Sequence, residues 1–306
     1  MEKVDVAIQS YKKPESLIYT LLCLKKYCGN HIDTVYINDD LSGEETIKFY
    51  TDENFIKAMF PIKIKLRINK YHFKPGVVQT TLPKYIFPLS LSDLHSLYKG
   101  LKQGFFIPEN DIRYQWAINT TDKSKLLILH DDVKINSDVV ALYLECFNSN
   151  SKLIISGQLG QCNICRHSQK GCIPAGIMKG IYPSKIWPKT ISITDNKQKY
   201  ICRINEWCCM IDVSKTKKIK SHFGAFYRGA DTAAYWFNEA VKKGYEFVDP
   251  FAEKNNHIEY FEHCWQGYAG HSVWIAKDKG LDIYNKNMIN DALLSDFGYK
   301  ISKSKT

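Results

Sequence analysis

The chain has 306 residues, and its 42 Lys and Arg against 32 Asp and Glu leave a formal net charge of +10. Hydrophobic residues make up 44% of the sequence and charged residues 24%, which excludes extensive disorder and suits one large α/β domain or two small ones. No stretch approaches the roughly 20 apolar residues of a membrane helix, and the first ten residues lack the apolar core of a signal peptide, so we expect a cytoplasmic protein.

The first 68 residues alternate between short apolar runs and helical spacing. Residues 4–9, 34–38 and 61–68 are predicted strands. Helices are expected to begin at Pro14, which suits a first helical turn, and at Ser42, which is placed to cap its helix. This order of elements is typical of a parallel sheet with right-handed crossovers.

The remaining elements are less regular, and residues 71–108 show no clear period. Helices are predicted at 111–121, 137–147 and 231–243, and strands at 126–129, 153–156, 200–213 and 245–248. There is no internal repeat and no linker rich enough to separate independent domains.

Polar residues follow three of the predicted strands. Ser10 and Tyr11 follow the first strand, Asp39 and Asp40 the second, and the His130–Asp132 segment the fourth. In open parallel sheets ligands bind beyond the carboxyl ends of the strands, so these groups should share one edge. The glycine patterns of dinucleotide and P-loop sites are missing. Carboxylates suit hydrogen bonds to a base or ribose and ligation of Mg²⁺ or Mn²⁺ on a diphosphate, although a single pair more often caps a turn.

Five segments resemble, in order and spacing, the motifs of family 2 glycosyltransferases. They are VDVAIQSYKKPESL (4–17), DDLS (39–42), RYQWAI (113–118), HDD (130–132) and GADTAAYWFNEAVKKG (229–244). The resemblance implies a GT-A fold: a Rossmann-like, mostly parallel sheet flanked by helices, with an irregular C-terminal acceptor-side region. Residues 1–156 would form the nucleotide-sugar-binding half of a single domain, and residues 157–306 the acceptor-side half with a cysteine-rich loop and a C-terminal extension.

The resemblance also implies binding roles. The residues expected near the donor nucleotide are Ser10, Tyr11, Asp39, Asp40, Arg113 and Asp131. Asp132 would ligate the divalent ion. The first position of this metal motif is His130 instead of Asp, and a histidine ligand tolerates Mn²⁺ better than Mg²⁺.

A histidine near the end of the core completes the metal site in several GT-A enzymes. His257, His263 and His271 are candidates here, and His271, in AGHSVW, has the most similar context. The expected cofactor is therefore Mn²⁺ or Mg²⁺.

Asp231 matches the general base of inverting members of the family. Such a base takes the proton of the acceptor hydroxyl as that hydroxyl attacks C1 of the sugar. Ala230 stands where an acidic residue usually precedes this Asp, and Asp231 could instead cap its helix. Glu206 is the second candidate catalytic carboxylate; the alternative is an ion pair with a basic side chain.

The cysteines raise a separate hypothesis. Cys162, Cys165, Cys172 and Cys202 could close a structural Zn²⁺ site, with Cys208 or Cys209 as a substitute for one of them. The alternative is that Cys202, Cys208 and Cys209 are apolar core residues of a strand.

The leading interpretation is an inverting, metal-dependent transferase of cell-surface polysaccharide synthesis. Its donor would be a nucleotide-sugar, with a UDP-sugar as the first candidate. Its acceptor would be a glycan or a lipid-linked sugar, and nucleic acid is not an expected partner. Lysine clusters at 215–220 and 300–305 suggest peripheral contact with the anionic inner membrane face.

Three alternatives remain. One is a nucleotidyltransferase of the same fold, which lacks support because no glycine-rich basic loop follows the first strand. The others are a nucleic-acid-binding protein and an inactive sugar- or nucleotide-binding protein with a structural zinc loop.

Overall fold

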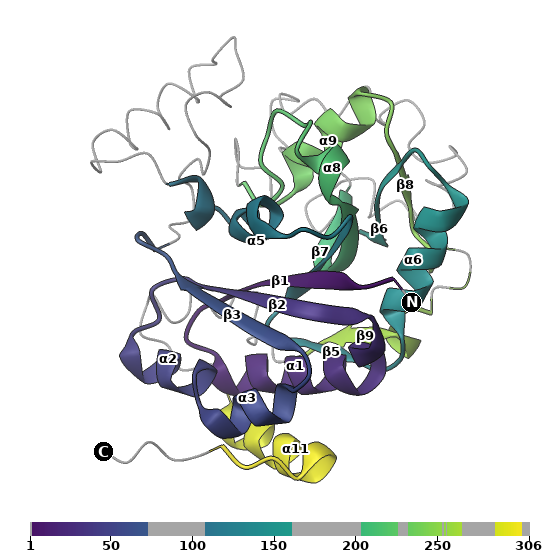
Figure 1. Ribbon diagram of the computed structural model, residues 1–306. Helices are drawn as coiled ribbons and strands as arrows, with labels where there is room; N and C mark the ends of the chain where they lie inside the picture. Colours follow the sequence, from purple (N-terminus) through teal and green to yellow (C-terminus); the bar gives the residue numbers. More distant parts are fainter. Residues whose placement is uncertain are drawn as a thin grey trace, which may run out of the picture.

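The structure is a computed structural model that describes residues 2–72, 108–160, 203–225, 232–252, 254, 256–264 and 285–301. Seven of its strands form one sheet in the order β3-β2-β1-β4-β7-β6-β8 (Figure 1). They are β1 (Val4–Ser10), β2 (Ile32–Asp39), β3 (Lys63–Ile68), β4 (Lys125–His130), β6 (Leu153–Gly160), β7 (Arg203–Asp212) and β8 (Glu246–Val248). Every strand expected from the sequence is present.

The sheet is mixed but mostly parallel. β1 pairs in parallel with β2 and with β4, β2 with β3, and β6 with β8. Strand β7 runs antiparallel to both of its neighbours, β4 and β6. The predicted α/β class with a mostly parallel central sheet flanked by helices is therefore confirmed.

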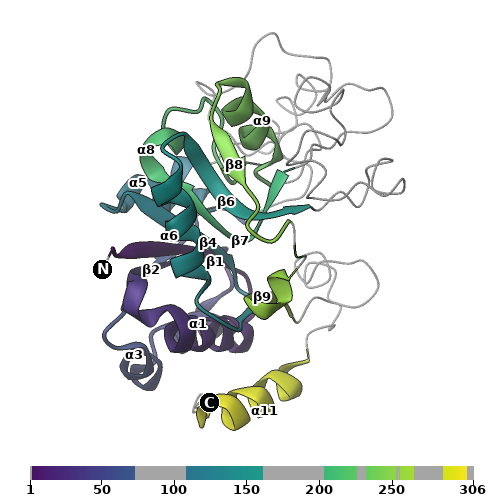
Figure 2. The same cartoon turned by 90° about the vertical axis from the view of Figure 1, so that its right-hand side faces the viewer.

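Helices cover both faces of this sheet (Figures 1 and 2). The elements on the first face are α1 (Pro14–Cys28), α2 (Glu44–Tyr50), α3 (Glu53–Met59) and α6 (Val139–Ser149), with α11 (Lys286–Phe297) packed outside α1. The opposite face carries α5 (Gln115–Thr120), α8 (Val213–Thr216) and α9 (Ala234–Lys242). None of the helices in the described ranges combines the length and the hydropathy that crossing a bilayer requires.

Alternation along the central strands separates two hydrophobic cores. In β1, Val6 and Ile8 face the α1 core, whereas Ala7 faces the core beneath α5 and α9. In β4, Leu127 belongs to the first core and Ile128 to the second. Strands that bury both faces read as continuous apolar runs, which is why the sequence revealed them.

Two helix starts differ from the prediction. Ser42 does not cap α2: Gly43, at φ 96°, is the N-cap, and the Ser42 hydroxyl accepts a hydrogen bond from the Lys12 amide at 2.8 Å. The helix expected over 111–121 is reduced to α5, because Tyr114 adopts a left-handed conformation with φ 64° and interrupts it.

Gly157 lies where β6 meets β7, and we expect alanine there to destabilise the protein. A Cβ atom at Gly157 would lie 2.6 Å from Cys209 Cβ and 2.6 Å from Ile204 Cγ2. Overpacking of this kind costs about 1–3 kcal/mol. Gly29→Ala is the matched control, because its added Cβ would approach nothing nearer than 3.6 Å. Urea unfolding of both variants is the measurement, and equal stabilities would contradict the packing described here.

Candidate functional site

The polar residues that follow β1, β2 and β4 share one edge of the sheet, as predicted. Ser10 is level with Asp39 in the β1–β2 pairing, and Gln9 is level with His130 in the β1–β4 pairing. Parallel pairing therefore brings together groups that lie 121 residues apart in the chain, such as Gln9 and His130.

A second, small sheet adds a histidine to this edge. Strand β5 (Val133–Ile135) begins directly after Asp132 and pairs antiparallel with β9 (Phe261–His263), with Val133 opposite His263. The amide of Cys264 donates to the Asp132 carbonyl at 2.8 Å, which extends the pairing. This ribbon holds His263 beside Asp132.

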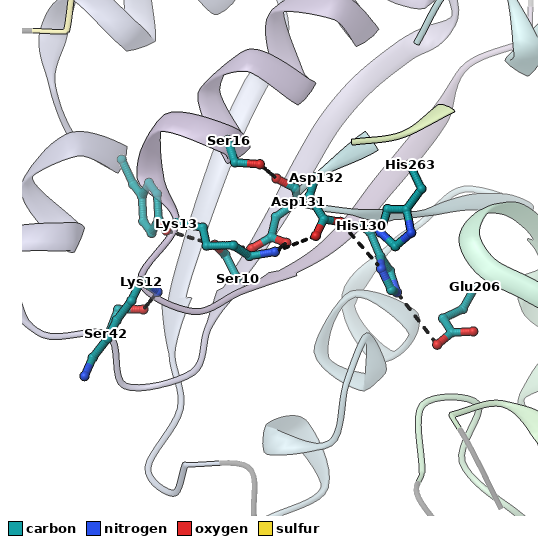
Figure 3. Close-up of polar contacts among 11 residues, drawn as sticks. Ser10, Lys12, Lys13, Ser16, Ser42, His130, Asp131, Asp132, Glu206 and His263 are labelled. Carbon is teal, nitrogen blue, oxygen red and sulfur yellow. Dashed lines mark hydrogen bonds and ion pairs between the residues drawn. The ribbon is translucent and has the colours of Figure 1, made fainter. Parts of the chain in front are cut away.

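His130, Asp132 and His263 form a cluster whose ligand atoms lie within 4.8 Å of one another. His263 Nε2 is 2.7 Å and His130 Nδ1 3.7 Å from the same oxygen, Asp132 Oδ1 (Figure 3). Two imidazole nitrogens and one carboxylate oxygen fit a divalent transition ion, because Mg²⁺ takes oxygen ligands. The donor set therefore fits the expected ion, with Mn²⁺ favoured over Mg²⁺.

Lys13 lies on the other side of the Asp131–Asp132 pair. It is the N-cap residue of α1 and only 1% exposed, and its ammonium group is 2.5 Å from Asp131 Oδ1 and 2.8 Å from Asp132 Oδ2 (Figure 3). Burial lowers the pKa of Lys13, but the two carboxylates outweigh burial and raise that pKa above its ordinary value. For Asp132, Lys13 and the two histidines overcome burial and hold the carboxyl pKa well below its usual range.

Asp131 and Ser10 are buried next to the cluster and are hydrogen-bonded to each other. Asp131 Oδ2 accepts a hydrogen bond from the Ser10 hydroxyl at 2.7 Å, and that hydroxyl lies 3.0 Å from the Tyr50 hydroxyl. The Ser16 hydroxyl donates to the Asp131 carbonyl at 2.6 Å. Ser10 is completely buried and Asp131 3% exposed, so both residues support the edge from within.

Glu206 lies behind His130 and is 2% exposed. Its carboxylate pairs with the buried Arg203 guanidinium through Oε2, and its Oε1 is 3.7 Å from His130 Nε2 (Figure 3). Burial raises the pKa of Glu206, but the positive charges of Arg203 and His130 lower it to about 2. The carboxylate therefore stays charged, and it faces a histidine of the cluster.

Asp40 and Tyr11 lie together further along the edge. Asp40 is completely buried: one carboxylate oxygen accepts from the Asn69 amide at 2.9 Å and the other is 2.7 Å from His72 Nδ1. The His72 ring lies against Tyr11, with centroids 4.4 Å apart. Asp39 is buried too, and its Oδ1 accepts from the Ser42 amide at 2.9 Å; burial raises the pKa of its carboxyl.

Arg113 connects two further motif segments, because its guanidinium donates to the Thr232 hydroxyl at 3.3 Å. The predicted sites that lie outside the described residues are Asp231, His271 and the cysteines Cys162, Cys165, Cys172 and Cys202. Cys208 and Cys209 are buried core residues of β7, which supports the core interpretation for these two.

Sequence reasoning did not identify Lys13, Arg203 or His72 as parts of the site. A lysine between a strand and a helix-starting Pro14 is common on protein surfaces, so Lys13 gave a signal only in combination with the two acidic pairs expected at the same edge. His72 and Arg203 belong to no motif, and only the three-dimensional structure places them.

Comparisons with known proteins find similarity among solved structures. No family profile and no curated protein matches the sequence. Among solved structures, the chain is similar to a mannosyltransferase from Pyrobaculum calidifontis in complex with GDP-Man and Mn²⁺ (9% identity, TM-score 0.46, 81% of this chain and 54% of that one). It is also similar to the galactosyltransferase LgtC in complex with donor and acceptor sugar analogues (12% identity, TM-score 0.35, 70% of this chain and 60% of that one). A third similar structure is glucosyl-3-phosphoglycerate synthase from Mycobacterium tuberculosis in complex with phosphoglyceric acid (7% identity, TM-score 0.35, 71% of this chain and 59% of that one). The chain thus spans between 54% and 60% of the length of these structures.

Proposed function

We propose that this protein is a metal-dependent glycosyltransferase that moves a sugar from a nucleotide-diphosphate donor to a glycan or lipid-linked acceptor. The observation that carries the proposal is the His130–Asp132–His263 cluster at the edge where β1, β2 and β4 end. Ligands bind at this edge in open parallel sheets, and a diphosphate needs a cation there.

The residues of the cluster are arranged to hold a cation and not to react. A bound divalent ion supplies positive charge that stabilises the departing nucleoside diphosphate. His130, Asp132 and His263 present their ligand atoms from two paired segments, so little reordering is needed on binding.

Glu206 fits a positioning role for His130. A carboxylate beside one ring nitrogen of a histidine attracts that nitrogen through its charge, which leaves the other nitrogen to face a metal. Glu206 faces Nε2, so Nδ1 is the nitrogen turned toward Asp132. We therefore assign Glu206 to the support of the ion site, where its buried pair with Arg203 keeps the carboxylate charged.

The Tyr11–Asp40 region suits the nucleoside part of the donor. An aromatic ring offers a stacking surface to a base, and a buried carboxylate is a strong acceptor for a base N–H or a ribose hydroxyl. Asp40 is completely buried and its two oxygens are held by Asn69 and His72, so in this proposal the nucleoside displaces His72 to reach it.

In this proposal Asp231 is the general base of an inverting reaction, and residues 157–306 contribute most of the acceptor side.

His263→Ala tests the proposal. In the presence of UDP, we expect Mn²⁺ to raise the melting temperature of the wild-type protein. We also expect a panel of UDP- and GDP-sugars to include a donor that is hydrolysed or transferred only when Mn²⁺ is added. Loss of a residue that only supports a metal ligand lowers metal affinity roughly 10- to 100-fold, so loss of the ligand His263 should weaken Mn²⁺ binding by at least this much.

His257→Ala is the matched control, because His257 precedes β9 and lies outside the cluster. It should keep the response to Mn²⁺. Unchanged melting temperature and turnover of the wild-type protein on addition of Mn²⁺ would overturn the proposed function.

A further inference from the structure

All four carboxylate oxygens of Asp131 and Asp132 have partners, and the two aspartates use them differently. Asp132 turns Oδ1 to the histidines and Oδ2 to Lys13. Asp131 turns Oδ1 to Lys13 and Oδ2 to Ser10. Asp131 therefore does not belong to the cluster that can hold a metal, although it is the sequence neighbour of one of its ligands.

Lys13 consequently places a buried positive charge against the carboxylate that would bind the ion. Its ammonium group is 2.8 Å from Asp132 Oδ2 and 1% of the residue is exposed, so solvent screens the charge little. A cation on Asp132 Oδ1 would be repelled by this ammonium group. Asp131, whose Oδ1 is 2.5 Å from the same ammonium group, offsets part of that repulsion.

We propose that Lys13 and Asp131 together set the affinity of the His130–Asp132–His263 site for its divalent ion, Lys13 lowering it and Asp131 restoring part of it without ligating the ion. This inference rests on the proposed function, because it concerns the ion expected in that site. Lys13 is a positioning residue: it anchors one oxygen of Asp132 and acts on the ion only through charge.

Asp131→Asn should weaken Mn²⁺ binding, although Asp131 is no ligand. The amide keeps the shape of the side chain and removes the charge that offsets Lys13, so we expect the dissociation constant to rise about tenfold or more. The Lys13→Met/Asp131→Asn double variant removes both charges and should bind Mn²⁺ within about threefold of the wild type. Neutral replacement of a whole buried ion pair is also better tolerated than loss of one partner.

Isothermal titration of the metal-free full chain with Mn²⁺ alone measures these constants without any turnover. Asp122→Asn, an exposed carboxylate before the opposite end of β4, is the matched control and should change nothing. Lys13→Met removes the repelling positive charge itself, so this variant should bind Mn²⁺ more tightly than the wild type.

The inference is overturned if the double variant binds as weakly as Asp131→Asn, which would make Asp131 a direct ligand. It is also overturned if Asp131→Asn binds like the wild type, or if folded Lys13→Met binds no more tightly. A wild-type chain that binds no Mn²⁺ would contradict the proposed function instead.

Discussion

Asp132→Asn should abolish Mn²⁺ binding and reduce donor turnover about 100-fold or more, because the ion supplies several kcal/mol of charge stabilisation. The Asp132 carboxylate is the centre of the cluster: His263, His130 and Lys13 all lie around its two oxygens. The amide has nearly the same shape but no charge to offer a cation. Mn²⁺ titration and donor turnover at saturating Mn²⁺ are the two measurements.

Glu262→Gln controls for this substitution. Glu262 precedes His263 in β9, and its half-exposed carboxylate pairs with Lys134 at 3.7 Å and not with the cluster. This variant should bind Mn²⁺ and turn over donor like the wild type. If Asp132→Asn retained full Mn²⁺ affinity in a folded chain, the assignment of Asp132 as a ligand would be wrong.

The second large effect is on stability and concerns the buried Arg203–Glu206 pair. Removal of one partner leaves an uncompensated buried charge, which typically costs 3–5 kcal/mol, so about this loss is expected for Arg203→Met at pH 7. The Arg203→Met/Glu206→Gln double variant should recover much of it, because neither side then carries a charge. Urea unfolding of the single and double variants measures the difference.

The same pair makes stability depend on pH. The pKa of Glu206 is about 2 in the folded chain against an ordinary 4.5. The carboxylate thus contributes stability that is fully present above pH 4.5 and is lost as the pH falls from 4.5 toward 2, about 3 kcal/mol in total at 1.36 kcal/mol per unit. Glu206→Gln should flatten the fall in unfolding free energy over this range. An unchanged pH dependence would show that Glu206 is not held charged by its neighbours.

The fold was largely predictable because the central strands are short apolar runs that bury both faces. Such runs are visible without any knowledge of their partners, and β1, β2 and β4 could also be assigned to one edge from the order of strands and helices. The direction of β7 was not predictable: RINEWCCMID has the same composition whether it runs parallel or antiparallel to β4.

The location of residues at the ends of the central strands could be predicted from the sequence, whereas the location of other site residues could not. His130 is the last residue of β4 and Asp132 follows two positions later, so their place at the edge depends only on that strand. His263 was one of three candidate histidines, and the local sequence context favoured His271. The β5–β9 pairing, which brings His263 to Asp132, involves strands of three residues that carry no periodic signal. Glu206 was a candidate catalytic carboxylate with an ion pair to a basic side chain as the alternative; the structure shows such a pair, with Arg203, a partner that the sequence did not indicate.

The most direct test of the central claim is a crystal structure of the full chain grown with Mn²⁺ and UDP, examined by anomalous scattering at the manganese edge. We expect one anomalous peak at ligand distance from His130, Asp132 and His263, with the diphosphate of UDP beside it. A peak elsewhere, or bound UDP with no ion between its phosphates and these three side chains, would contradict it.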